Sequence, residues 1–294
     1  MGSRSEIHVI AGAIADAEGR VLIAQRPRGR HMAGRWEFPG GKLGSGEDPY
    51  VGLQRELAEE LGVTVREARP LIRLRHEYPD RRVLLDVWEV TAYDGEPQAL
   101  DAQALAWARP DELPMHDLLE ADRPIVTALR LPRLARVLAA GESLQFIRGS
   151  AAQAILVPEP ADSAGGPDAE SVSAARAAGH RVFVMGDDVD AVRIAAMARC
   201  DGVVLRWHGQ SLHVDRSGAF LVGAQCVDAE GATQAVAEGA HFLVIAPEDG
   251  PMSERLLERL CVMVGRPVFA GWYADARRLE RLQQVGAHGC AVRR

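Results

Sequence analysis

The sequence predicts an α/β protein of two domains: an α/β/α sandwich with a mixed sheet in residues 1–131, followed by a truncated (β/α)8 barrel of the TIM type in residues 132–294. Two patterns predict this. The first domain reads as rich in strands with two helices, which fits a mixed sandwich. After Leu131-Pro132, short strands alternate with helices, as they do in a barrel. A chain of 294 residues with 47% hydrophobic residues is long enough for two cores.

The first domain is expected to begin with two strands, residues 8–15 and 21–25, joined as a hairpin through the turn-like segment Asp16–Gly19. Residues 48–61 carry apolar side chains at helical spacing, and Gly62 is the stop signal of that helix. Three more strands and a second helix are expected at 71–78, 83–93, 104–108 and 123–130.

The second domain is expected to begin with a helix at residues 133–140, before the barrel strands start. Eight short strands follow, at 144–148, 154–157, 181–185, 202–205, 219–223, 241–245, 267–270 and 288–292. Helical patterns fill most of the gaps, at 171–178, 188–199, 228–238, 252–264 and 275–285. Only residues 149–153 separate the first two strands, so the first βα unit is truncated.

The charge of the chain argues against two classes of partner. The net charge is −7, and residues 1–131 hold 17 basic and 22 acidic side chains, a net charge of −5. The sequence therefore lacks the basic surface that binds a nucleic-acid backbone or an anionic membrane. No apolar run is long enough for a spanning helix, and residues 1–7 are mostly polar, so we expect a cytoplasmic protein. Assembly into a homo-oligomer stays open.

Cysteine and lysine usage excludes further kinds of chemistry. The cysteines lie in or beside apolar segments without CxxC spacing, which favours buried thiols over disulfides or metal ligands. They are Cys200, Cys226, Cys261 and Cys290. Lys42 is the one lysine among 34 basic residues. Chemistry that needs several lysines is excluded, because arginine does not readily lose its proton.

The stretch that carries the chemistry runs from Gly41 to Val63. Glu56, Glu59 and Glu60 occupy positions i, i+3 and i+4 of one helix, so their carboxylates share a face and repel one another. A hard divalent cation resolves this repulsion, and oxygen ligands of this kind suit Mg²⁺ or Mn²⁺. The glycines before the helix let the backbone fold tightly against the site and supply a carbonyl ligand, expected from Gly40. The acidic run on its own would be read as a solvated helix face.

The complete pattern, Gly41-Lys-Leu-Gly-Ser-Gly-Glu47 and then Arg55-Glu-Leu-Ala-Glu-Glu-Leu-Gly-Val63, resembles the Nudix box, and the resemblance extends over residues 7–131. Within that superfamily the domain looks most like the MutT-type 8-oxo-dGTP diphosphatases. The supporting segments are Gln25–Pro27, His31–Lys42 and His76–Arg81. The resemblance implies Mg²⁺-dependent attack of water on a nucleoside triphosphate, which releases a monophosphate and pyrophosphate. Such enzymes clean the nucleotide pool and so prevent mutations.

The same resemblance assigns roles to single residues. Gly40, Glu56, Glu59 and Glu60 would hold metal, together with Asp101. Glu56 would also orient or deprotonate the attacking water, because the metal lowers the pKa of that water. Glu47 and Arg55 are expected to tie the loop to the helix rather than to touch the substrate.

For the base, the resemblance nominates Arg26, Phe38, Arg81 and Asp122. Phe38 could stack on a purine or be part of the core, and Asp122 could accept hydrogen bonds from a base edge or be the N-cap of the helix at 123–130. The MutT-type pattern commonly has Asn where Asp122 stands, and a carboxylate only accepts hydrogen bonds. The loop arginines Arg28, Arg30 and Arg35 could attract the triphosphate or be solvated charges.

The second domain resembles, weakly, thiamine-phosphate synthase, a (β/α)8 enzyme. The similar segments are Met185–Asp190, Cys200–Leu205, His208–Gln210, Val222–Cys226, Gly239–Val244 and Gly286–Val292. Enzymes of that family bind the diphosphate with lysines, and this domain contains no lysine. The loop Ala246–Gly250 is acidic where the family has a basic phosphate-binding loop. Strand seven ends in the bulky Trp272, where the backbone would have to approach the phosphate closely. We therefore expect a domain without synthase activity, in which Asp187, His208 and Gln210 bind a small ligand or are remnants.

Three functional hypotheses follow. The first is a house-cleaning diphosphatase that prefers oxidised purine triphosphates. The second is a Nudix hydrolase for thiamine-related or other diphosphates, which would discriminate little between 8-oxo-dGTP and dGTP. The third makes the barrel a ligand-binding or regulatory module of the hydrolase. In each, the partner is a small molecule.

Overall fold

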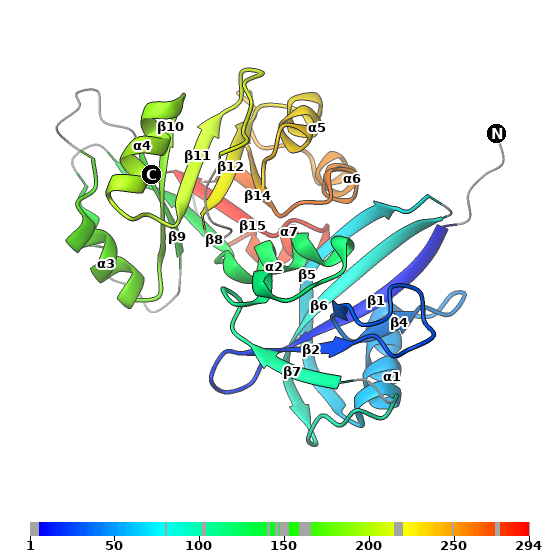
Figure 1. The fold of residues 1–294 in the computed structure, drawn as a ribbon. Helices are drawn as coiled ribbons and strands as arrows, with labels where there is room; N and C mark the ends of the chain where they lie inside the picture. Colours follow the sequence, from blue (N-terminus) through cyan, green and yellow to red (C-terminus); the bar gives the residue numbers. More distant parts are fainter. Residues whose placement is uncertain are drawn as a thin grey trace. The chain divides into compact units, whose positions relative to one another are not determined.

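The computed structural model describes residues 6–79, 81–101, 104–139, 142–144, 147, 153–158, 166–214, 220–248, 250–273 and 277–293. The chain divides into two compact units, Met1–Arg130 and Leu131–Arg294 (Figure 1). Among the described residues, no helix is both long and apolar enough to cross a bilayer.

The first unit contains two sheets. The larger has the order β4–β1–β6–β5, from Gly40–Lys42 (β4), Glu6–Ile14 (β1), Arg82–Asp94 (β6) and Thr64–Glu77 (β5). It is mixed, because β1 runs parallel to β6 and antiparallel to β4. The smaller has the order β3–β2–β7, from Trp36–Glu37 (β3), Val21–Gln25 (β2) and Ala104–Ala108 (β7).

The predicted hairpin of the first two strands is wrong. β1 and β2 lie in different sheets and share one isolated bridge, Ala15 to Val21. Local turn chemistry favours pairing across Asp16–Gly19, but Ile10 and Leu22 are both fully buried, and each strand needs a partner that covers its apolar side chains. Those partners, β6 and β7, come from far along the chain.

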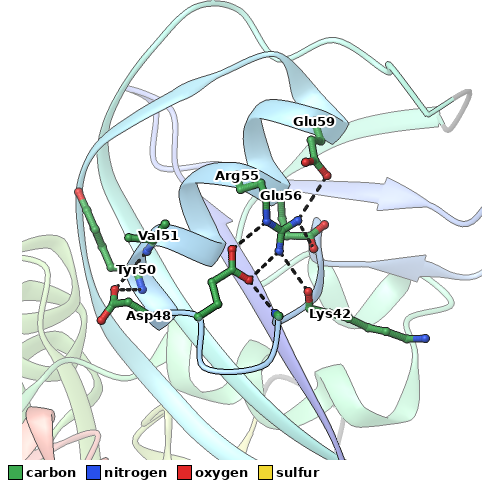
Figure 2. Close-up of polar contacts among 9 residues, drawn as sticks. Lys42, Asp48, Tyr50, Val51, Arg55, Glu56 and Glu59 are labelled. Atoms are coloured by element: carbon green, nitrogen blue, oxygen red, sulfur yellow. Dashed lines mark hydrogen bonds and ion pairs between the residues drawn. The ribbon is translucent and has the colours of Figure 1, made fainter.

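Helix α1, Pro49–Leu61, has the apolar spacing and the Gly62 stop read from the sequence, and it begins one residue later than expected. The Asp48 carboxylate caps it by accepting the amides of Tyr50 and Val51 (Figure 2), and Gly62 ends it with φ at +71°. Its buried leucines pack on β1, where a side chain at Gly12 would meet Leu57 Cδ1 at 2.7 Å. Glycine in β1 therefore sets how closely the helix approaches the sheet. Two short 3-10 turns, Leu113–Met115 and Glu120–Asp122 (η2), precede α2, Arg123–Arg130.

The second unit is a closed barrel of parallel strands. In chain order they are Leu134–Val137 (β8), Gln153–Pro158 (β9), Arg181–Gly186 (β10), Gly202–Arg206 (β11), Leu221–Cys226 (β12), Phe242–Ile245 (β13), Val268–Tyr273 (β14) and Gly289–Arg293 (β15). The helices are Ala169–Ala177 (α3), Val189–Met197 (α4), Ala229–Ala237 (α5), Glu254–Val264 (α6) and Leu279–Gln284 (α7). The predicted fold class, a mixed α/β unit followed by a truncated barrel, is confirmed.

The helix predicted at 133–140 is wrong, because β8 lies there and pairs with β15 and β9. Leu134–Val137 has good helix formers, but Ala135 and Val137 alternate inward and complete the barrel. Most of the strand predicted at 144–148 lies outside the described residues. Residues 138–152 separate β8 from β9, so the five-residue gap expected between the first two strands is wrong, and the described residues of this segment form no α-helix.

The barrel interior is a packed core. Phe183, Phe242 and Phe269 are fully buried and meet edge to face, with ring centroids 5.3 and 6.0 Å apart. A side chain at Gly223 would meet the Phe242 ring at 2.4 Å, so the strands leave room for these rings. All four cysteines are free and buried, as predicted, and burial raises the pKa of Cys200, Cys226 and Cys261 to about 12.

Removing the central ring tests this core. Phe242→Ala is expected to lower the unfolding free energy by about 3–5 kcal/mol, because the cavity cannot be refilled by the neighbouring strands. Urea unfolding with hydrogen–deuterium exchange of the barrel amides would measure it. Leu256→Ala, at a side chain that is 56% exposed, is the control and should change little. A loss below about 1 kcal/mol for Phe242→Ala would contradict tight packing.

Candidate active site

One cavity of about 710 Å³ in the first unit brings the predicted site residues together. Its lining includes all nine residues nominated from the sequence, namely Arg26, Phe38, Gly40, Glu56, Glu59, Glu60, Arg81, Asp101 and Asp122. They come from β4, α1, η2 and the segments that follow β2, β3, β5 and β6. The apolar floor comes from β1 and β6, with Val9 and Leu85 directly paired in parallel register.

The three α1 glutamates differ in exposure. The Glu56 side chain is 12% exposed and that of Glu59 is 62% exposed, so Glu56 faces the protein and Glu59 faces solvent. Glu60 Oε2 accepts the amide of Gly40 at 3.0 Å, which joins the helix to β4. A side chain at Gly41 would meet Glu56 Oε2 at 2.2 Å, so this glycine leaves the space that the Glu56 carboxylate fills.

Arg55 holds the glutamate helix against the preceding loop (Figure 2). Its guanidinium donates from Nε and Nη2 to the two oxygens of Glu47, each at 2.9 Å, and from Nη2 to the Lys42 carbonyl at 3.2 Å. Nη1 donates to Glu56 at 2.8 Å and to Glu59 at 3.4 Å. Glu47 also accepts the Gly44 amide, and neither Arg55 nor Glu47 lines the cavity. Both residues tie the loop to the helix, as predicted.

The cavity is also lined by a half-buried ion pair. Arg26 Nη1 donates to Glu37 Oε2, and both side chains are largely buried. Burial raises the pKa of Glu37, and the charge of Arg26 opposes that rise. Phe38, 4% exposed, belongs to the core and still lines the cavity, so its two interpretations are compatible.

Asp122 lies beside this pair and is 5% exposed. Its Oδ2 accepts the Phe38 amide at 3.4 Å, whereas none of its hydrogen bonds among the described residues goes to the amides of α2. The helix-cap interpretation therefore has no support in its contacts. Burial raises the pKa of the Asp122 carboxyl well above its usual range, and the Glu37 carboxylate adds to that rise.

Arg81 lies in a cluster of aromatic side chains at the end of β5. Its guanidinium lies over the Tyr78 ring at 5.2 Å from the centroid, and His76 meets the same ring edge to face at 4.5 Å. Tyr78 and Glu37 line the cavity but were not nominated from the sequence. Both lie in sequence segments that resemble the MutT-type enzymes. That position was the one signal in the sequence that could have indicated their place in the site.

The loop arginines separate into different roles. Arg30 lines the cavity and forms an ion pair with Asp101, with 3.1 Å between Nη2 and Oδ2. Each of these two side chains therefore has the other as its partner. Arg35 lies 3.6 Å from Asp117 outside the cavity. Arg28 is exposed and does not line it, which fits a solvated charge.

Comparison with known proteins identifies the first unit. Residues 10–128 match the sequence profile of the NUDIX domain. An 8-oxo-dGTP diphosphatase of Proteus vulgaris is 44% identical over 96 residues, which cover 33% of this chain and 86% of that protein. A CTP pyrophosphohydrolase of Escherichia coli is 38% identical over 130 residues, which cover 44% and 96%. The 8-oxo-dGTP diphosphatase of Escherichia coli is 33% identical over 125 residues, which cover 42% and 97%.

The chain belongs to the Nudix hydrolases. Enzymes of this family generally use a divalent metal ion, and the Nudix cavity fits one. Burial, together with the charges of Glu37, Glu56 and Asp101, raises the pKa of Glu60 to about 7, although its bond to the Gly40 amide opposes this. A cation would relieve that repulsion, and the donors are the carboxylate and carbonyl oxygens that Mg²⁺ takes. Among the described residues, no three acidic, histidine or cysteine side chains already converge as a metal-binding group.

In the barrel unit of this Nudix hydrolase, the polar residues noted at the strand ends bind one another. Arg206 donates from Nε and Nη2 to Asp187, and His208 Nε2 lies 3.6 Å from the same carboxylate. Gln210 accepts the His208 amide at 2.7 Å and donates to the Arg206 carbonyl at 2.6 Å. The amino ends of α3, α4 and α5 are capped by Asp168, Asp188 and Asp228.

The pairing of Glu47 with Arg55 makes a prediction about pH. Hydrogen bonds from Arg55, followed by that from Gly44, lower the pKa of Glu47 from 4.5 to about 2. The contribution of the ionised Glu47 to the free energy of unfolding is therefore complete above pH 4.5, and it is lost as the pH falls towards 2. The urea midpoint of Glu47→Gln should lie below that of the wild type at neutral pH, and the gap should close over this range. Glu96→Gln, at an exposed position, is the control, and a constant gap would contradict the assignment.

The close approach of the Glu56 carboxylate to Gly41 leads to a second prediction. Gly41→Ala is expected to displace the Glu56 carboxylate and to lower kcat/KM about 100-fold, with little change in stability because a flexible side-chain end can move. Gly46→Ala is the matched control, because Gly46 has φ at +73° and open space around it. That variant should lose stability but keep activity. Full activity of Gly41→Ala would refute the placement of Glu56.

Proposed function

We propose that this Nudix hydrolase splits nucleoside triphosphates into a monophosphate and pyrophosphate with Mg²⁺, Mn²⁺ being the alternative ion. The observation that carries the proposal is that one cavity is lined both by the glutamates of α1 and by Phe38 and Asp122. A triphosphate lying against α1 would place its base in that cavity. The names of the relatives make 8-oxo-dGTP the first candidate and CTP the second.

Each residue has a part in this proposal. Gly40, Glu56, Glu59, Glu60 and Asp101 would hold the metal ion, which neutralises charge on the phosphate oxygens and acidifies bound water. Glu56 orients the attacking water and accepts its proton, held in place by Arg55. Phe38 offers a ring to the base, and Arg26, Arg81 and Asp122 offer polar contacts.

We propose that residues 1–131 form the catalytic domain and that residues 132–294 lack synthase activity. The barrel has no lysine, its strand-end polar groups are engaged with one another, and aspartates already cap three helix amino ends where a phosphate would bind. In the acidic loop 246–250, Asp249 lies outside the described residues. A small ligand or a regulatory role stays open for this domain. A nucleotide-pool enzyme of this kind would act in the cytoplasm on free nucleotides.

Pyrophosphate release with Mg²⁺ tests the proposal, over 8-oxo-dGTP, dGTP, CTP, the other triphosphates and thiamine-pathway diphosphates. We expect kcat/KM for 8-oxo-dGTP to exceed that for dGTP, and Glu56→Gln to lower it about 10³-fold. Glu96→Gln controls for the loss of one exposed carboxylate. Preference for a thiamine-type diphosphate would replace the proposed substrate, and full activity of Glu56→Gln would refute the assigned catalytic helix.

A further inference from the structure

We propose that the Arg30 guanidinium competes with the metal ion for the Asp101 carboxylate in the free enzyme, and that it binds the phosphate chain once a nucleoside triphosphate has entered. Arg30 would thereby link the completion of the metal site to the arrival of the substrate. The inference rests on the proposed function, which places Asp101 among the metal ligands, and it adds a residue that couples metal binding to phosphate binding.

Arg30 and Asp101 lie on segments that leave the same edge of the smaller sheet. Gln25, the last residue of β2, pairs with Ala104, the first residue of β7, so the segment that follows β2 and the one that precedes β7 meet at this edge. Arg30 Nη2 donates to Asp101 Oδ2 at 3.1 Å, across 71 positions of the chain. Both residues line the cavity, so this hydrogen bond lies in the wall of the proposed active site.

The side from which Arg30 reaches Asp101 distinguishes it from Arg55. Arg55 donates to Glu56 but does not line the cavity, so it can hold that carboxylate without entering the space that a metal ion would use. Arg30 itself lines the cavity, so its guanidinium and a metal ion would approach Asp101 from the same side. Two cations at such short range repel each other, and the guanidinium therefore has to leave the carboxylate when the ion binds.

The contact is weak enough to be exchanged. The side chain of Arg30 is 62% exposed and that of Asp101 is 48% exposed, and ion pairs in contact with water contribute little stability. The loop backbone has hydrogen bonds of its own, such as that from Gln25 Nε2 to the Gly34 carbonyl at 2.8 Å. The Ala33 amide also donates to the Arg30 carbonyl at 3.1 Å. Arg30 can therefore change its partner by rotating its side chain, without a rearrangement of the loop.

The charges of the cavity give the released Arg30 a place on the substrate. The lining contains more acidic side chains than basic ones, so a triphosphate meets repulsion there. One of the basic side chains, Arg26, is already paired with Glu37. Arg30 has the planar fork that binds two phosphate oxygens at once, and the metal ion would take its place at Asp101.

Metal binding in the absence of nucleotide tests the competition. Mn²⁺, followed by the electron paramagnetic resonance of the free ion, should bind Arg30→Gln about two- to fivefold more tightly than the wild type, because one exposed ion pair no longer competes. Arg28→Gln is the matched control, since it removes one positive charge from the same loop at an exposed position outside the cavity, and its Mn²⁺ affinity should stay at the wild-type value. In an Asp101→Asn background, Arg30→Gln should have no effect on Mn²⁺ binding.

Steady-state kinetics at saturating Mg²⁺ test the contact with the phosphate chain. Arg30→Gln should raise KM for the preferred triphosphate about tenfold and leave kcat within about twofold, because a contact made equally in the bound substrate and in the transition state alters binding alone. Arg30→Lys keeps the charge without the fork, so its KM should lie between those of the wild type and Arg30→Gln. Arg28→Gln should keep the KM of the wild type.

Weaker Mn²⁺ binding by Arg30→Gln would overturn the inference, because Arg30 would then orient Asp101 for the metal instead of competing with it. An equal gain in Arg28→Gln, or a gain that persists in the Asp101→Asn background, would overturn it too, since the contact would not be the cause. So would an unchanged KM in Arg30→Gln. If no nucleoside triphosphate were hydrolysed, the proposed function would fail, whereas the Mn²⁺ titrations would still decide whether Arg30 competes for Asp101.

Discussion

The hydrogen bonds of the Arg55 guanidinium are the interaction on which the Nudix site depends. They join Glu47 and the Lys42 carbonyl, from the glycine-rich segment, to Glu56 and Glu59 on the helix that follows. Without a cation at this point, the carboxylates on one face of α1 would repel one another, and Glu47 would lose its ion pair with the helix. Bidentate pairing suits arginine, whose planar fork holds two oxygens at once. The geometry of the loop and the position of Glu56 therefore have one cause.

The lining of the cavity contains more acidic side chains than basic ones, and some of the acidic ones are buried. Glu37, Glu60 and Asp122 each have a raised pKa because burial disfavours their charge, and the Glu37 carboxylate adds to the rise at both Glu60 and Asp122. Arg26 is committed to Glu37. A cation would relieve the repulsion around Glu60, whereas Asp122 has the Phe38 amide as a hydrogen-bond donor.

The barrel unit has a packed interior and strand-end polar side chains that bind one another. Its stability comes from interior rings such as Phe242, which need no ligand. At the carboxyl ends of the strands, Asp187 and Arg206 satisfy each other. Side chains that are paired in this way are not available to a phosphate group, which agrees with the absence of lysine from the domain.

The sequence by itself determined the local features. Helix α1 follows from its spacing, its Asp48 cap and Gly62, and the carboxylate face follows from positions i, i+3 and i+4. The tertiary structure alone decided which strands pair, because the partners of β1 and β8 lie far away in the chain and local propensity does not encode them. It also decided the roles of Glu37, Tyr78 and Asp122. A residue type gives the ordinary pKa of a carboxyl group, but burial and the neighbouring charges, which only the folded chain creates, set its actual value.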